Sequence, residues 1–227
     1  MCGRYTLTYA DLGEVADLLG AIVTPPALDL HQPRFNVAPS NGCVIALATA
    51  DTEARPALVP ALWGVRHGGR LIINLRGETA AARLPEAFAS GRCVVPADGF
   101  YEWHGERADR RPVWFHAPDG SPLLMAALLE RERTATPAFA ILTGPARPPV
   151  SAIHDRMPVL LTPESARRWL HHAPARVRAD EVALIGTDVS PRVNAVAHDD
   201  PTCIAPFTEP TRQLDLFSGI PSGARTG

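Results

Sequence analysis

Short apolar runs rich in β-branched and aromatic residues recur along the chain at intervals of roughly ten residues, separated by Gly, Pro, Asp and Asn. Runs this short and this rich in β-branched residues are typical of strands. Strands are expected at residues 43–49, 57–65, 71–76, 93–97, 112–117, 123–129, 139–143 and 157–162, and another at the amino terminus. So many short strands must pair in sheets, and the pattern predicts a mixed, barrel-like β-sheet.

Helical periodicity is confined to a few short segments. The apolar residues of "LGEVADLL" (12–19) share one helical face, so a helix is expected there. Short helices are also expected within residues 78–88 and 163–172, the second with Pro163 in its first turn. The Pro-rich residues 23–40 are expected to form a loop. With few helices and many strands, the expected fold class is α+β.

The length of 227 residues suits one domain, which we place at residues 1–207. Residues 208–227 are rich in Pro, Gly and Ser, and we expect a flexible tail there. No apolar run reaches membrane-spanning length, and the first residues lack the basic-then-apolar pattern of a signal peptide. We therefore expect a cytoplasmic monomer that does not associate with membranes.

Four cysteines, Cys2, Cys43, Cys93 and Cys203, show no spacing typical of metal sites, so neither a metal nor another cofactor is expected. The net charge of −2 opposes a uniformly electropositive surface but leaves room for a local DNA-binding groove. All 22 basic residues are arginine. With no lysine in the chain, Schiff-base chemistry would have to use the α-amine.

The first residues, "MCGRY", place a thiol beside the amino terminus. The small side chain of Cys2 would permit removal of Met1. The mature chain would then begin with an α-amine and a thiol on one residue.

Three further stretches carry candidate groups. In "LIINLR", an extended backbone puts Asn74 and Arg76 on one face, although a solvated edge strand would explain them too. In "ADGFYEW", Glu102 lies among three aromatic residues, where desolvation would raise its pKa and suit it to proton transfer. A surface glutamate between core aromatics is the alternative. In "IHDRMP", His154 and Asp155 precede a strand, a pairing that is also common in turns.

In their order along the chain, "MCGRYTL", "RFNVAPS", "WGV", "NLRGETAA", "CVVPADGFYEW", "AILT", "IHDRMPVLL" and "RVNAVAHDDPTCI" resemble the SOS response-associated peptidase (SRAP) family. The resemblance extends from Cys2 to about Phe207. It implies a protein that crosslinks covalently to abasic sites in single-stranded DNA. One departure is the segment 64–73, which is shorter than the family leads us to expect and contains no lysine.

The resemblance also implies site residues. Cys2 would be the crosslinking residue, Asn74 and Glu102 would lie in the active site, and His154 would be a second acid or base. The implied DNA-binding residues are Arg4 and Arg76, which would hold phosphates, and Asn36, Pro39, Trp63 and Trp103, which would border the lesion and the DNA path. From the residues alone, Asn36 and Pro39 fit capping as well as ligand contact.

The implied chemistry suits an amino-terminal cysteine. A ring-opened abasic deoxyribose is an aldehyde, with which an amine forms an imine and a neighbouring thiol then closes a thiazolidine. The second step is intramolecular and so has a high effective molarity. An α-amine with a pKa of ~7.7–8.0 is also far more often neutral at pH 7 than a lysine at ~10.4.

Other chemistries remain open at this point. Class II glutamine amidotransferases also begin Met-Cys-Gly and use the thiolate as nucleophile. Their start continues differently from Arg4-Tyr5. A thiol peptidase using Cys2 and His154, which could act only on the protein's own amino terminus, is a second alternative. Strand cleavage by β-elimination could accompany the imine. A DNA-binding module with an idle Cys2 is a third.

The tail contains "QLDLF", which resembles the short peptide by which bacterial DNA-handling proteins bind the replication sliding clamp. The partner-binding residues would be Gln213, Leu214, Leu216 and Phe217. Isolated apolar residues in a flexible segment cannot bury themselves locally, so docking on a partner would give them a role.

We predict that Leu216→Ala with Phe217→Ala abolishes capture of this protein on immobilised clamp, because the motif loses both apolar anchors. The measurement is a pulldown with purified proteins. Undiminished capture of the double variant would contradict the prediction.

Overall fold

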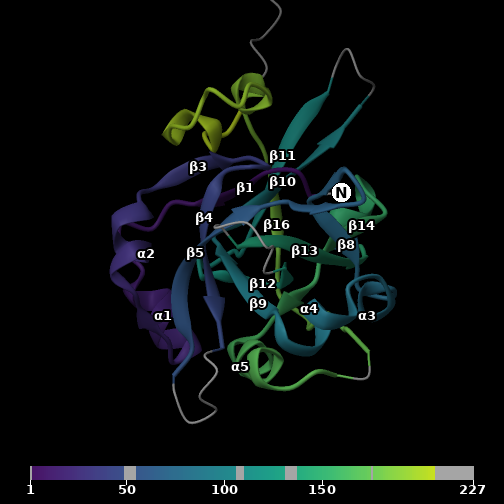
Figure 1. Cartoon of the computed structure of the whole chain (residues 1–227). Helices are drawn as coiled ribbons and strands as arrows, with labels where there is room; N and C mark the ends of the chain where they lie inside the picture. Colours follow the sequence, from purple (N-terminus) through teal and green to yellow (C-terminus); the bar gives the residue numbers. More distant parts are fainter. Residues whose placement is uncertain (1, 49–54, 106–109, 131–136, 175, 208–227) are drawn as a thin grey trace, which may run out of the picture.

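The computed structural model describes residues 2–48, 55–105, 110–130, 137–174 and 176–207, and the predicted tail with its clamp motif lies outside them. Its larger sheet closes into a ring (Figure 1). The ring consists of β4 (Gly42–Leu47), β5 (Ala57–Trp63), β9 (Arg92–Ala97), β12 (Leu123–Glu130) and β13 (Ala138–Pro145). Neighbours pair antiparallel except for β13 and β5, whose parallel pairing closes the ring. The predicted barrel-like sheet is confirmed.

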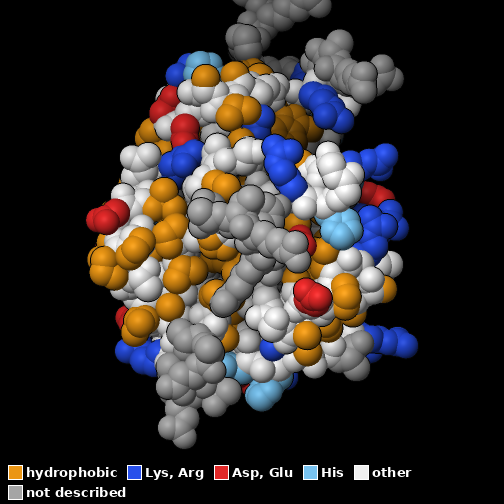
Figure 2. Space-filling view, viewed as in Figure 1, with side chains coloured by type: hydrophobic (Ala, Val, Ile, Leu, Met, Phe, Trp, Pro, Cys, Tyr) orange, Lys and Arg blue, Asp and Glu red, His pale blue; other side chains and the backbone are white. Residues whose placement is uncertain are grey.

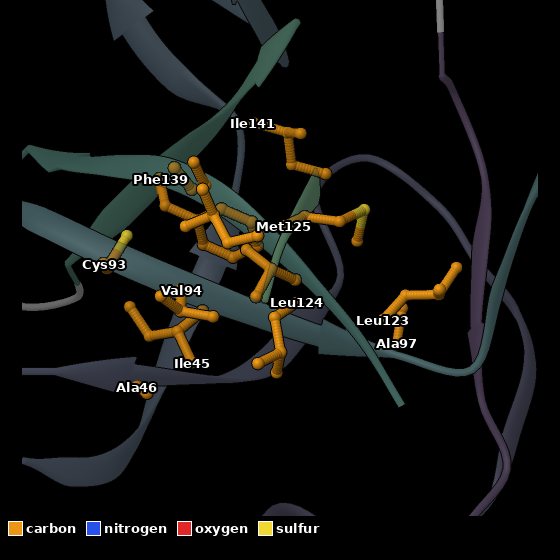
Figure 3. Packing of buried hydrophobic residues seen from close by; sticks show 14 of the residues in the cluster. Ile45, Ala46, Cys93, Val94, Ala97, Leu123, Leu124, Met125, Phe139 and Ile141 are labelled. Carbon is orange, nitrogen blue, oxygen red and sulfur yellow. The ribbon is translucent and has the colours of Figure 1, made fainter. Parts of the chain in front are cut away.

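The core lies within and around this ring. Strands β9 and β12 are buried along nearly their whole length, which explains why they appear as continuous apolar runs instead of alternating ones. Figure 3 shows side chains of β4, β9, β12 and β13 packed together, among them Ile45, Val94, Leu124 and Phe139. All four are fully buried.

A second sheet runs in the order β16-β11-β10-β1-β3. Its strands are β1 (Tyr5–Leu7), β3 (Arg34–Val37), β10 (Gly99–His104), β11 (Arg111–His116) and β16 (Ile185–Asp188). A single residue, Asp98, separates β9 from β10, so one continuous stretch of chain links the two sheets. Asp98 fixes this corner by accepting a hydrogen bond from the Thr8 backbone N–H at 3.0 Å. The strand β16 was not predicted.

The helices are short and lie outside the ring (Figure 1). They are α1 (Gly13–Leu19), α2 (Pro25–Leu30), α3 (Ala80–Arg83), α4 (Pro85–Ser90) and α5 (Pro163–His171). The helix α5 begins as predicted, with Pro163 in its first turn and the Thr162 hydroxyl accepting from the Ser165 N–H. The expected loop over residues 23–40 is wrong, because it contains α2 and β3, and Asn36 therefore lies in a strand.

The remaining strands are β2 (Ile22–Val23), β14 (Arg156–Pro158) and β15 (Leu160–Leu161), which extend the larger sheet through β5, β13 and β12 respectively. Short 3₁₀ helices at Val150–Ala152, Pro191–Asn194 and Pro201–Cys203 complete the description. No helix in the described part of the chain is long and apolar enough to span a membrane.

The predicted strand at 71–76 is divided in two. Residues Arg70–Ile72 (β7) pair with Val65–His67 (β6) as a separate hairpin, and Asn74–Arg76 (β8) returns to pair parallel with β13. The hairpin turns at Gly68 and Gly69, whose φ angles of 57° and 76° suit a type I′ turn. The strands β5 and β8 thus occupy successive stretches of one edge of β13, with the hairpin inserted between them.

We predict that Gly99→Ala destabilises the protein by about 2–3 kcal/mol, because the new Cβ would overlap the indole of Trp114, which lies directly over Gly99. The matched control is Gly144→Ala, also in a strand, where the nearest atom to a Cβ is a Val159 methyl at 3.6 Å. Urea denaturation measures both. Equal unfolding free energies for the two variants would contradict the prediction.

Candidate active site at the amino terminus

The chain start is held against β10. Strand β1 pairs antiparallel with β10, Tyr5 opposite Phe100, and the Tyr101 N–H donates to the Arg4 carbonyl at 3.0 Å. This pairing carries Cys2 along β10 towards Glu102, and Cys2 is fully buried. Figure 1 shows the amino terminus beside β8 and β14, the strands that carry or adjoin Asn74 and His154.

Asn74 contacts Cys2 directly. Its Nδ2 donates to the Cys2 carbonyl at 2.6 Å, and its own backbone is held in β8 by pairing with Ile141 of β13. The Asn74 Oδ1 is buried and accepts no hydrogen bond from the residues that the structure describes. A buried acceptor of this kind favours a ligand with a hydroxyl or amine donor.

Glu102 is almost fully buried, with 2% of its surface exposed. Its pKa is raised to about 7, mainly by burial and also by the nearby Asp155 carboxylate, against the opposing effect of the α-ammonium. The expectation of a carboxylate among three aromatics needs correction. Alternation along β10 puts Tyr101 and Trp103 on the opposite face, where they pack near Val193 and Cys203. The desolvation thus comes from the barrel side of the sheet.

His154 follows the 3₁₀ helix at Val150–Ala152 and precedes β14. Its Nδ1 lies 3.0 Å from the Arg156 backbone N and 2.9 Å from Asp155 Oδ1. A backbone N–H can only donate, so in the neutral ring Nδ1 accepts and the proton is on Nε2. Burial, followed by the charge of the α-ammonium, lowers the pKa of the imidazole and so favours this neutral form, while Asp155 acts in the opposite direction.

The thiol of Cys2 is held in its protonated form. Burial, followed by the Glu102 carboxylate, raises its pKa well above the ordinary range. Its S–H donates to the Arg4 carbonyl, with the sulfur 3.5 Å from the oxygen. Activated cysteine nucleophiles instead show a lowered pKa. In the chain that still carries Met1, the thiol is therefore neutral.

The predicted DNA-binding residues divide into buried and accessible ones. Asn36 is fully buried, and its Oδ1 accepts from Arg4 Nη1 at 2.9 Å. Trp63 is also fully buried, and its Nε1 donates to the Ile73 carbonyl at 2.9 Å, closing the base of the β6–β7 hairpin. Both side chains are thus buried rather than accessible in this structure.

The other predicted contacts lie nearer the surface. Arg76 is exposed at the end of β8, two residues after Asn74. Trp103 is half-buried, and its Nε1 donates to Asn194 Oδ1 at 2.7 Å. Pro39 is half-buried in the turn after β3, where Ser40 N donates to the Trp63 carbonyl. In Figure 2, several arginine and histidine side chains, with acidic ones between them, lie around the area where Figure 1 places the amino terminus.

One pair at the site was not predicted. Arg156 is 8% exposed and donates to both oxygens of Glu78, at 3.1 and 2.8 Å, and to the Thr143 carbonyl at 2.6 Å. These bonds tie β14, and with it His154, to the turn after β8. Both residues stand in the motifs quoted above, the arginine in "IHDRMP" and the glutamate directly after Gly77. Spacing in the sequence cannot pair residues so far apart.

Residues 1–196 match the family described as SOS response associated peptidase (SRAP). The chain belongs to the SRAP family. The resemblance drawn from the motifs is therefore confirmed. Among the described residues, this SRAP protein has no group of three or more His, Cys, Asp or Glu placed to hold a metal ion.

Relatives and solved structures agree with this assignment. The SRAP chain is 34% identical over 197 residues to the abasic site processing protein YedK of Escherichia coli, covering 82% of this chain and 86% of that protein. It is 30% identical over 184 residues to YoqW of Bacillus subtilis, also named abasic site processing protein, covering 75% and 80%.

Two crystal structures share the fold. A phage-related protein from Bordetella bronchiseptica superposes with a TM-score of 0.65 at 29% identity, covering 83% of this chain and 94% of that one. A protein from Bacteroides thetaiotaomicron gives a TM-score of 0.76 at 17% identity, covering 91% and 100%, and shows the fold alone.

The burial of Glu102 in this SRAP protein has a cost that depends on pH. The folded-state pKa of about 7 lies above the ordinary value of 4.5, so the unfolded chain releases its proton first as pH rises. Stability contributed by the protonated carboxyl is thus lost between these two pH values. At 1.36 kcal/mol per pKa unit the loss reaches about 3 kcal/mol as an upper bound.

We therefore predict that Glu102→Gln is about 1–3 kcal/mol more stable than the unaltered protein at pH 8, and nearly equal to it at pH 4.5, as measured by urea denaturation. The exposed Glu181 provides the control, since Glu181→Gln should leave stability unchanged at both pH values. A Glu102→Gln variant less stable at pH 8 would contradict the prediction.

Proposed function

We propose that this protein captures abasic sites in single-stranded DNA by a covalent bond to Cys2. The observation that carries the proposal is the gathering of Asn74, Glu102 and His154 around a buried amino-terminal cysteine whose thiol is neutral. The names of the curated relatives, abasic site processing proteins, support the substrate class. The reaction would shield the lesion.

The reaction begins after removal of Met1. The α-amine of Cys2 adds to the C1′ aldehyde of the ring-opened sugar, and the carbinolamine loses water to give an imine. The thiol sulfur then adds to the imine carbon while its proton passes to the nitrogen, closing a thiazolidine. Overall, aldehyde and aminothiol combine with loss of one water, and no oxidant or metal is required.

Three side chains support these steps. The pKa of Glu102, about 7, is close to the ~7.7–8.0 of an α-ammonium. Its carboxylate can therefore take a proton from the α-ammonium and return it when the carbinolamine loses water. His154 would donate a hydrogen bond from Nε2–H to the sugar ring oxygen as the ring opens, while the proton lost by the C1′ hydroxyl passes through water to that oxygen. Asn74 Nδ2 fixes the Cys2 carbonyl, and its Oδ1 would accept a bond from the sugar or the adduct.

The neutral thiol separates this proposal from the alternatives. A peptidase or amidohydrolase using Cys2 would need a thiolate, whereas burial and Glu102 raise the pKa of this thiol. In the proposed sequence the amine reacts first, and the sulfur attacks only an activated imine already bonded to the same residue. In this proposal the removal of Met1 does not use the Cys2 thiol as a nucleophile, and lyase cleavage would be a side reaction of the imine.

The DNA contacts follow from exposure. Arg76, exposed beside Asn74, would hold a phosphate next to the lesion. So would Arg4, whose Nη1 donates to Asn36 and to the Val193 carbonyl while its other nitrogens have no partner among the described residues. The half-buried Trp103 and Pro39 would border the DNA. Residues 1–207 would form the reacting domain.

We predict that the purified protein forms a heat-stable adduct with a single-stranded oligonucleotide carrying one abasic site, with a mass equal to the sum of the two minus water. Cys2→Ala should abolish this adduct, because its amine can form only a reversible imine. Cys2→Ser is the matched control and should form an adduct that survives only after borohydride reduction. Intact mass and denaturing gels measure all three.

Heat-stable adduct in Cys2→Ala would contradict the thiazolidine. Absence of adduct from the unaltered protein with Met1 shown to be removed would contradict the proposed function as a whole.

A further inference from the structure

Two neighbouring cavities lie next to the proposed active site, beyond the end of β8. The first, of about 420 Å³, begins at Gly77 and Glu78 and ends at Val177 and Arg178. We call it the Gly77 cavity. The second, of about 310 Å³, lies between α5 and residues 176–180, and we call it the α5 cavity. Val177 and Arg178 line both, so the cavities meet across these two residues.

The Gly77 cavity starts where the proposed active site ends. Gly77 directly follows Arg76, and the Gly77 N–H donates to the Thr143 carbonyl at 2.9 Å. The Glu78–Arg156 pair forms the boundary towards His154. A Cβ at Gly77 would lie 3.2 Å from Val177 side-chain atoms, so glycine is what lets residues 176–180 approach β8.

Basic side chains line both cavities. Arg147 lines the first, Arg168, His172 and Arg176 line the second, and Arg178 belongs to both. Among the described residues, the guanidinium groups of Arg176 and Arg178 form no hydrogen bond or ion pair. Both side chains belong to exposed residues.

The acidic groups in the same walls are already engaged. Glu78 binds Arg156 through both oxygens. Asp180 Oδ2 accepts from the Thr162 backbone N–H at 2.8 Å and from its hydroxyl at 3.1 Å. Arg147 donates to the carbonyls of residues 179 and 180 at 3.0 and 3.2 Å, which holds this segment in place without neutralising the charge. Arg168 is paired with Glu164 at 2.6 Å, and Asp180 keeps its own charge. The excess positive charge of the cavities therefore comes from Arg147, Arg176 and Arg178, which outnumber Asp180.

The floor is apolar. Leu161, Trp169 and Val177 underlie the charged rim, so the α5 cavity combines a surface for a flat apolar group with cations above it. An unpaired nucleotide has this composition, a base with a phosphate on either side. A free phosphate would use the rim alone and leave the floor empty.

We propose that the DNA strand on one side of the lesion leaves the Cys2 site over Gly77 and runs through both cavities, its phosphates on Arg147, Arg178 and Arg176. The inference rests on the proposed function, because it takes single-stranded DNA as the substrate. It adds a second contact region beyond the lesion and makes binding depend on the length of one flank.

The test uses oligonucleotides with a tetrahydrofuran abasic analogue, which binds but cannot crosslink. A short form has two nucleotides on each side of the lesion, and two longer forms add six nucleotides on the 5′ or the 3′ side. We expect one extension to tighten binding by about tenfold or more at low salt, and Arg176→Ala with Arg178→Ala to remove that gain. Two lost phosphate contacts should also reduce the slope of log K against log salt by about 1.4.

The control double variant is Arg55→Gln with Arg167→Gln. It removes the same charge from exposed arginines that donate to carbonyls of residues 18, 20 and 21, beside α1. This control should keep the gain from the longer flank. Both double variants should retain the unfolding midpoint of the unaltered protein, and both should crosslink the short oligonucleotide at the unaltered rate.

Equal loss of affinity in the two double variants would overturn the inference, because it would reveal only a general charge effect. Binding of the unaltered protein that does not change with either extension would overturn it as well. Inorganic phosphate that weakens binding of the short and the long forms equally would also overturn it, because Arg176 and Arg178 would then not distinguish the two forms. Failure to crosslink a true abasic site would instead reject the proposed function, since analogue binding does not require that reaction.

Discussion

The parallel pairing of β13 with β5 and β8 is the constraint on which the rest of the structure depends. The first residues of β13 close the ring, with Ala138 opposite Leu62 and Phe139 opposite Trp63. Its later residues hold β8 on the same edge, with Ile141 opposite Asn74, and β14 on the other edge. One buried strand therefore both completes the core and sets the separation between Asn74 and the segment bearing His154. A slip of one residue would turn Asn74 to the opposite face.

Burial, more than charge pairing, sets the chemistry of the site. Desolvation is the largest cause of the raised pKa values of Cys2 and Glu102 and of the lowered pKa of His154. All three groups are thereby pushed towards their neutral forms. Such a site is poorly suited to a thiolate and well suited to moving single protons while an amine condenses with an aldehyde. The burial of Glu102 that costs stability also keeps its pKa near that of the α-ammonium with which it would exchange a proton.

Most strands could be predicted from the sequence, because buried strands such as β9 and β12 appear as unbroken apolar runs. The failures arose where local signals were weak or contradictory. Prolines at 25 and 26 indicated a loop but begin α2, where a missing N–H costs nothing in the first turn. The break at Ile73 has no sequence signal, since it depends on the pairing partners of β7 and β8 changing.

For the site, the motifs identified the residues that gather at Cys2 but could not tell which side chains would be buried, so Asn36 and Trp63 were grouped with accessible DNA contacts.

The burial of Asn36 explains how the far end of the described chain supports its beginning. Its Nδ2 lies within hydrogen-bond distance of the carbonyls of Val193, Ala195 and His198, and Arg4 Nη1 donates to both Asn36 Oδ1 and the Val193 carbonyl. The Asp199 carboxylate accepts from the backbone N–H of Asn36 at 2.8 Å, which locks the same segment onto β3. Arg4 is only two residues from Cys2, so residues 193–199 fix the direction in which the amino terminus leaves β1. In the proposed reaction this fixed direction would keep the amine and thiol of Cys2 beside Glu102 and Asn74, whereas ring closure joins two groups of one residue and has its high effective molarity in any case.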